Sequence, residues 1–288
     1  MTDLYPGIRV HNVKKELIDK LYSDKEIEVW DNRYNWYENL YVVVKDETGS
    51  SSSALAKVKG NKLKLLFVDQ NLNISGIKAR NKEQCFALDA LLDDYIKVIV
   101  LTGKAGTGKT ILTLAAALHA MDQRKYDRII LTRPMSWVGK HSLGALPGDI
   151  EDKFGPYLEN YMCNLQYMMG GNKQRVKDLI AQYHMEFLPL QLIRGASWAN
   201  SFIVADEVQT LDYHEMVTLG TRVGENSKIV IMGDLAQRDE KITRDKTGIY
   251  KFVNSDEAKN SNFVSSIELI KTERGKVAEL FAEVFGAT

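Results

Sequence analysis

The stretch Gly103-Lys104-Ala105-Gly106-Thr107-Gly108-Lys109-Thr110 decides the fold, because it fits the phosphate-loop pattern G-x-x-x-x-G-K-[ST] at every fixed position. A β-branched apolar run at residues 98–101 precedes it, and an Ala- and Leu-rich stretch at residues 111–121 follows it. A strand, a glycine loop and a helix in this order point backbone N–H groups and a helix N-terminus at one spot. The sequence therefore predicts a polyphosphate site, in which Lys109 attracts the β- and γ-phosphates and Thr110 offers a hydroxyl to Mg²⁺.

The composition fits a globular protein with one large α/β domain and a smaller module. The chain has 288 residues, of which 44% are hydrophobic and 26% are charged. Lys plus Arg and Asp plus Glu both number 38, so bulk charge gives no support to nucleic-acid binding. The two cysteines are too few for a disulfide framework or a cysteine-based metal site. No apolar run reaches the roughly 18 residues of a membrane span, and we expect a cytoplasmic protein without a membrane partner.

The chain changes character near residue 75. Residues 40–44 read as a strand, and residues 54–59 and 62–68 read as two more strands around a Gly-Asn turn. We therefore expect a small antiparallel β module within residues 1–75. It either caps the main domain or stacks aromatics on bases, with Trp30, Tyr34, Trp36 and Tyr37 as the candidates.

From residue 76 to residue 288 the pattern is alternating strand and helix. Such alternation predicts a parallel sheet with helices on both faces. The long interval between residues 134 and 185 predicts a loop followed by one or two helices. The expected strands lie at residues 97–102, 129–132, 202–205, 228–232 and 263–270.

An Asp-Glu pair, Asp206 and Glu207, ends the buried run at residues 202–205. Alone such a pair is usually a solvated turn. Opposite a phosphate loop it suits ATP hydrolysis, with Asp206 in the Mg²⁺ shell and Glu207 as the general base for water. A kinase that transfers phosphate to a bound acceptor would not need the second carboxylate.

Two amide side chains are further candidates. Gln237 follows a buried strand in the motif Gly-Asp-x-x-Gln, and we expect it at the same sheet edge, where it senses the γ-phosphate or the attacking water. Gln84 lies just before the first strand, and its amide suits the edge of adenine. The alternative for that segment is the start of a surface helix with Asn81 as N-cap.

Taken in order, these motifs resemble the PhoH family of ATPases, whose core is similar to the RecA-type core of superfamily 1 helicases. The resemblance runs from about residue 76 to the C-terminus. Some relatives carry a PIN nuclease domain ahead of a similar β module. We expect that domain to be lacking here, so a ribonuclease role is not supported. The stretches that carry the resemblance are RNKEQ, GKAGTGKT, LTRP, LGALPGD, IRG, ADEVQT, TRVG, GDLAQRD and TER.

The resemblance implies a role for each matching residue. Gln84 reads adenine, residues 103–110 hold the phosphates of ATP, Thr110 and Asp206 bind Mg²⁺, and Gln237 senses the γ-phosphate. Arg274 matches an arginine that approaches the nucleotide, and Arg222 is a second candidate. Such an arginine raises the hydrolysis rate by a factor of about 10³–10⁵. The ATPase rate should therefore be low until the arginine reaches the transferred phosphate.

The resemblance also implies partners. Since the chain has room for a single RecA lobe after the loop, we expect a neighbouring subunit to complete the site in a hexameric ring. Single-stranded nucleic acid, RNA more than DNA, is the expected polymer. A loop at residues 136–141 either contacts single-stranded nucleic acid or forms a lid over ATP. The candidate contacts are Arg133, Trp137, Lys140, His141, Lys153 and Arg194.

We therefore expect an Mg²⁺-dependent ATPase that binds, moves along or remodels single-stranded nucleic acid. An ATPase switch that acts on a protein partner without helicase activity is the alternative.

Overall fold

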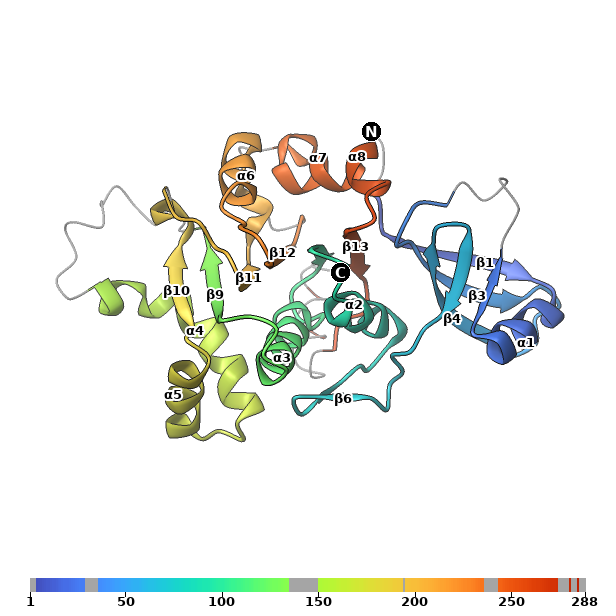
Figure 1. Cartoon of the computed structure of the whole chain (residues 1–288), viewed down its shortest axis with the longest axis horizontal. Coiled ribbons are helices and arrows are strands. Elements are labelled where there is room, and N and C mark those ends of the chain that lie inside the picture. Colours follow the sequence, from blue (N-terminus) through green and yellow to red (C-terminus); the bar gives the residue numbers. More distant parts are fainter. Residues whose placement is uncertain are drawn as a thin grey trace.

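The computed structural model describes residues 4–28, 36–134, 150–193, 195–235 and 243–273, with positions 280 and 284. Figure 1 shows a small β module beside a larger α/β unit. The two units follow each other along the chain, as the sequence predicts. The predicted boundary after residue 75 falls in the turn of a hairpin formed by β6 (Asn73–Ile74) and β7 (Ile77–Lys78), and it stays a prediction.

The β module is a five-stranded sheet in the order β1-β3-β4-β5-β2. Its antiparallel centre agrees with the sequence-based expectation. The preceding segment adds two strands and a helix, and β1 pairs parallel with β3, so the module is antiparallel in all but this described pair. Its elements are β1 (Ile8–Val13), α1 (Lys15–Asp24), β2 (Glu26–Glu28), β3 (Tyr41–Asp46), β4 (Ser53–Lys59) and β5 (Lys62–Leu65).

The larger unit contains a six-stranded parallel sheet in the order β10-β9-β11-β12-β8-β13. Five of its strands confirm the expected ones. The sixth, β10, was not predicted, because it is a four-residue edge strand that ends in proline. The strands are β8 (Val98–Gly103), β9 (Arg128–Arg133), β10 (Glu186–Pro189), β11 (Ser201–Ala205), β12 (Lys228–Gly233) and β13 (Val264–Leu269).

Helices cover both faces of this sheet, with α2 to α5 on one side and α6 to α8 on the other (Figure 1). The long interval after β9 holds two helices, as expected. None of the helices in the described part of the chain is long and apolar enough to cross a membrane. The helices are α2 (Lys82–Leu92), α3 (Lys109–Asp122), α4 (Ile150–Met168), α5 (Lys173–Gln182), α6 (Tyr213–Gly220), α7 (Gly248–Asn254) and α8 (Asp256–Lys259).

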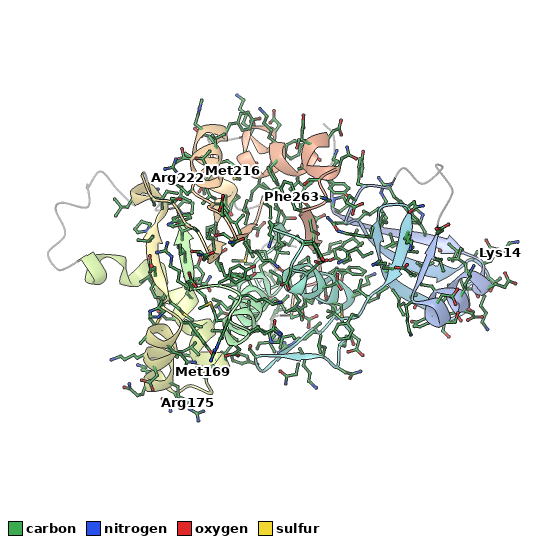
Figure 2. The ribbon with its side chains drawn as sticks, viewed as in Figure 1. Lys14, Met169, Arg175, Met216, Arg222 and Phe263 are labelled. Carbon is green, nitrogen blue, oxygen red and sulfur yellow. The ribbon has the colours of Figure 1, made fainter. Side chains whose placement is uncertain are left out.

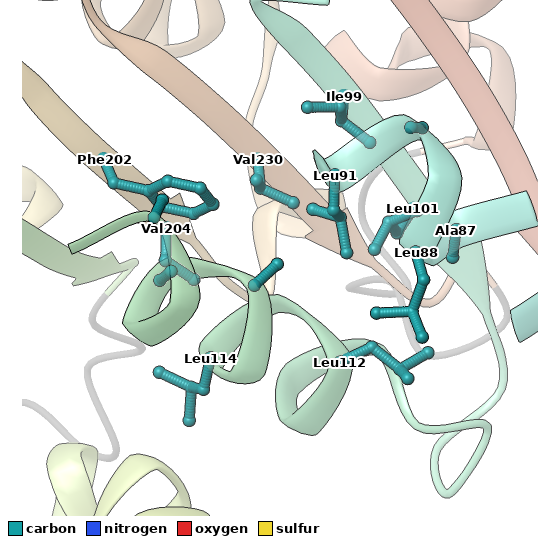
Figure 3. Packing of buried hydrophobic residues seen from close by; sticks show 14 of the residues in the cluster. Ala87, Leu88, Leu91, Ile99, Leu101, Leu112, Leu114, Phe202, Val204 and Val230 are labelled. Carbon is teal, nitrogen blue, oxygen red and sulfur yellow. The ribbon is translucent and has the colours of Figure 1, made fainter. Parts of the chain in front are cut away.

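The central residues of the strands are mostly apolar and buried, as expected for a sheet that is covered on both faces. On one face Leu101 and Val230 pack in one cluster with Leu88 of α2 and Leu112 of α3 (Figure 3). On the other face the alternate strand residues pack against α6 and α7 in a second cluster. Burial on both sides fixes the strand register, and therefore the place where each strand ends.

The β module is attached to the larger unit through α2. The rings of Tyr41 and Phe86 lie 5.0 Å apart, and the Tyr41 hydroxyl donates to Asp89 Oδ2 at 2.9 Å. Lys57 Nζ lies 2.8 Å from carboxylate oxygens of both Asp89 and Asp93. These contacts suit the structural cap, one of the two roles that the sequence analysis leaves open.

Candidate nucleotide site

The phosphate loop turns sharply between β8 and α3. Gly103 has φ +141°, and a Cβ there would lie 2.2 Å from the Leu269 carbonyl oxygen. Gly108 has φ +95°, and a Cβ there would lie 2.9 Å from the Gln84 amide nitrogen. Glycine is therefore required at both positions. Lys109 Nζ donates to the carbonyls of Gly103 (2.6 Å) and Lys104 (3.1 Å), which places its charge within the loop.

Asp206 follows the last residue of β11 and is 3% exposed. Its Oδ2 accepts from the Thr110 hydroxyl (3.1 Å) and from Asn160 Nδ2 (3.3 Å), and its Oδ1 accepts from the Glu207 N–H (2.9 Å). Burial raises the pKa of Asp206 and Glu207 raises it further, while the bonds from Glu207 N–H and Thr110 and the charge of Lys109 lower it. The raised pKa indicates that this carboxylate is incompletely neutralised by its protein neighbours.

Glu207 is held in place by a side chain to which the sequence analysis gave no role. Gln209 Nε2 donates to Glu207 Oε2 at 2.6 Å, and Gln209 Oε1 accepts from the Asp234 N–H at 3.1 Å. Gln209 thus links the ends of β11 and β12. A Cβ at Gly233 would lie 2.9 Å from Gln209 Oε1, so glycine makes room for this link. Glu207 itself has φ 57°, an uncommon conformation for a residue with a side chain.

These strand ends line one cavity of about 380 Å³. It brings together Lys109, Thr110, Asp206 and Glu207, which the sequence placed in one site, and the adjacent Asp234. Its wall also includes Arg133 at the end of β9 and two asparagines of α4, Asn160 and Asn164.

A second cavity of about 610 Å³ adjoins the first and shares four lining residues with it: Gly106, Gly108, Ile111 and Asn164. Gln84 lines this second cavity, with its Nε2 donating to the Thr107 carbonyl (2.9 Å) and its Oε1 accepting from the Arg80 N–H (2.8 Å). Asn81 is the N-cap of α2, as one alternative held, yet Gln84 is buried and the helix start is not on the surface. Adenine recognition by Gln84 stays a prediction.

The segment after β13 returns to the phosphate loop. The Glu273 N–H donates to the Gly106 carbonyl at 2.9 Å, and Asn81 Nδ2 donates to Glu273 Oε1 at 2.8 Å. Glu273 also lines the second cavity. The Thr-Glu-Arg motif therefore reaches the site through Glu273.

Known proteins resemble this chain in sequence over most of its length. The family model described as PhoH-like protein matches residues 76–286. The chain belongs to the PhoH-like protein family. It is 36% identical to Protein PhoH2 of Bacillus subtilis, over 98% of this chain and 64% of that protein. It is 31% identical to Protein PhoH2 of Mycolicibacterium smegmatis, over 97% of this chain and 62% of that protein.

The PhoH-like chain thus spans less than two thirds of the length of these relatives. Among solved structures, it is similar to the SWI2/SNF2 ATPase core of Sulfolobus solfataricus in complex with dsDNA. The TM-score is 0.42 with 18% sequence identity, over 68% of this chain and 40% of that chain. Family membership and the cavity lined by the phosphate loop, Asp206 and Glu207 support assignment as a P-loop NTPase with an α/β core.

Several residues that the sequence predicts for the site lie away from the two cavities, in an unexpected place, or outside the described ranges of this PhoH-like chain. Arg222 lies beside α6 (Figure 2), where it donates to the Ala196 carbonyl at 3.3 Å, and it lines neither cavity. Arg133, expected to contact nucleic acid, lies in the wall of the phosphate cavity. Lys153 belongs to α4, but its side chain is not described. The predicted residues that lie outside the described ranges are Trp30, Tyr34, Trp137, Lys140, His141, Arg194, Gln237 and Arg274.

The oxygen atoms at the phosphate end of the cavity are suitable ligands for Mg²⁺. In phosphate-binding sites this cation usually takes one or two protein oxygens and completes its shell with phosphates and water. The Thr110 hydroxyl and Asp206 Oδ2, 3.1 Å apart, supply such a pair. The described part of the chain holds no cluster of three or more His, Cys, Asp or Glu suited to a metal. The donor set therefore fits a cation that depends on the nucleotide for its remaining ligands.

Proposed function

We propose that this PhoH-like chain hydrolyses ATP with Mg²⁺ and couples hydrolysis to binding and remodelling of single-stranded nucleic acid, RNA in particular. The observation that carries the ATPase part is the common cavity of Lys109, Asp206 and Glu207 at the carboxyl ends of adjacent strands. Ligands of open parallel sheets bind at this edge.

Each residue has a distinct task in this proposal. Lys109 and the loop N–H groups bind the β- and γ-phosphates. Thr110 and Asp206 would hold Mg²⁺, which neutralises charge on the phosphates when bound. Glu207 accepts a proton from the attacking water, and its bond from Gln209 Nε2 fixes the orientation of the carboxylate.

The activating arginine and the ring assembly belong to the proposal as well. Arg133 is already in the wall of the phosphate cavity, so it is a candidate within the chain. Arg222 lies by α6 and would have to act on a neighbouring subunit. Arg274 and Gln237 keep the roles that the family motifs imply, as does a hexameric ring that completes the site.

The nucleic-acid part is supported by residue types and by family membership. The segment 136–141 combines an aromatic ring, a cation and a glycine, which suits a single-strand contact. Lys153 and Arg194 would contact the phosphate backbone.

The test is ATP turnover with and without single-stranded RNA or DNA, with the solution mass measured by light scattering. We expect stimulation by RNA, a hexameric mass, and salt-sensitive RNA binding. Glu207→Gln should lower turnover by about 10²–10⁴ while ATP affinity stays close to that of the wild type. Glu225→Gln, on an exposed turn, is the matched control.

Each result bears on a different part of the proposal. ATP turnover without stimulation or nucleic-acid binding would favour the protein-partner switch. Normal turnover in Glu207→Gln would remove Glu207 as the base. A fully active monomer at high dilution would exclude the ring.

A further inference from the structure

Helix α4 presents one face to both cavities. Asn160 lines the phosphate cavity, Asn164 lines both cavities, and Cys163 and Tyr167 line the second one. Their spacing of three and four residues places them on the same side of a helix. This face therefore runs along the length of the nucleotide cleft.

The same helix is fixed to the sheet edge that carries Asp206. The buried Tyr161 hydroxyl donates to the Thr132 carbonyl at 3.1 Å, and that carbonyl also accepts from the Asp206 N–H at 2.9 Å. Asn160 Nδ2 reaches Asp206 Oδ2 directly. Leu165, which is 0% exposed, belongs to the core cluster beneath the sheet. The cleft-facing side of α4 is thus held in register with the catalytic carboxylates.

The second cavity has the chemistry of a base site. A purine offers two apolar faces and a polar edge. Ile77, Ile111 and Leu112 supply apolar wall, while Gln84 and Glu273 supply polar groups. Tyr167 adds an aromatic ring that is 63% exposed, so its surface is accessible to a ligand. Aromatic rings stack on bases with a typical contribution of about 1–3 kcal/mol.

We propose that α4 forms a wall of the nucleotide site, in addition to the phosphate loop and the strand ends. The Tyr167 ring stacks on the base, and Asn160 lies beside the Asp206 carboxylate at the phosphate end. This inference rests on the proposed ATP site and adds a base-binding residue outside the phosphate-loop and acid-pair motifs. It predicts that the base and the phosphates depend on different side chains of one helix face.

The experiment measures dissociation constants of ATP, ADP and inorganic tripolyphosphate by calorimetry. Tyr167→Ala should weaken ATP and ADP binding by about 10-fold, within the range expected for loss of one stacking contact. Tripolyphosphate affinity should not change, because that probe has no base. Tyr167→Phe should bind ATP like the wild type, since the ring is kept. Tyr95→Ala, another exposed tyrosine that lines neither cavity, is the control.

Equal ATP affinity of Tyr167→Ala and the wild type would overturn the inference. An equal loss for ATP and tripolyphosphate would also overturn it, since the residue would then act on the phosphate end or on the fold. Thermal melts of each variant distinguish an effect on the phosphate end from a loss of the fold. Failure of the proposed function has another signature: the wild type itself would bind neither ATP nor tripolyphosphate, and the inference would fall with it.

Discussion

Two buried acidic clusters in this chain have opposite electrostatic character. Where the β module meets α2, burial raises the pKa of Asp93, but Lys57, the Tyr95 N–H and Lys59 together outweigh that effect and the net pKa is lowered. At the nucleotide cleft, burial and Glu207 outweigh the donors around Asp206, and the net pKa is raised. In the first cluster a cation contacts the carboxylates directly, whereas the direct partners of Asp206 are a hydroxyl, an amide and a backbone N–H.

The difference separates a carboxylate that its neighbours neutralise from one that is suited to bind a cation. A carboxylate that its neighbours neutralise contributes to folding, as in the Lys57 cluster. A buried carboxylate beside a like charge destabilises the fold and is suited to bind a cation that arrives with a ligand. We therefore expect the site to cost some stability, which a substitution can reveal.

The largest difference in stability between the two clusters is expected from the substitution Lys57→Met. The substitution leaves Asp89 and Asp93 without their shared cation in a mostly buried setting, and we expect a loss of about 3–5 kcal/mol in the free energy of unfolding. Denaturant unfolding measures it. The control is Lys64→Met in the same module, whose exposed pair with Glu26 is screened by solvent and should contribute far less to stability.

The pH dependence of unfolding tests the same cluster. Asp93 has a lowered folded-state pKa, so its contribution is present above the unfolded value of about 4 and is lost as pH falls through the folded value. For Lys57, burial lowers the pKa but Asp89 and Asp93 raise it by more. Its contribution is therefore complete below about pH 10 and is lost as pH rises through the folded pKa. The Lys57→Met variant should therefore lose less stability than the wild type at both low and high pH. Unchanged losses of stability at both ends of the pH range would contradict this assignment.

A smaller effect, which differs between the two clusters, is expected when one aspartate of each is replaced by asparagine. Asp93→Asn removes a partner of Lys57 and should cost about 1–3 kcal/mol. Asp206→Asn removes a carboxylate whose ionised form is disfavoured by burial and by Glu207, so it should cost less stability than Asp93→Asn. Thermal and denaturant unfolding of both variants provide the comparison. An equal loss in both would erase the distinction between the clusters.

The sequence predicts those parts of the site that are local along the chain. The phosphate loop and the Asp206-Glu207 pair each follow a buried strand, and parallel strands end at one edge. The same rule could have placed Arg133 in the cleft, since it ends β9. Gln209 lies within a quoted motif, but its link to Asp234 depends on the adjacency of β11 and β12.

Other contributors could not be read from local patterns. Asn160 and Tyr167 lie on a helix whose cleft-facing side is decided by its packing on the sheet. Glu273 reaches the phosphate loop only because β13 pairs with β8. Such contacts join segments far apart in the chain, and composition and periodicity carry little information about them.

The most direct test of the central claim is calorimetric titration of ATP into wild type, Lys109→Ala and Lys173→Ala. If the ends of β8, β11 and β12 form one nucleotide site, the wild type binds ATP in the presence of Mg²⁺. Lys109→Ala should then bind at least about 10²-fold more weakly, because a buried charge-assisted contact is lost. Lys173→Ala, at the exposed start of α5, should bind like the wild type. Equal binding by Lys109→Ala and the wild type, or no binding by the wild type, would contradict the account.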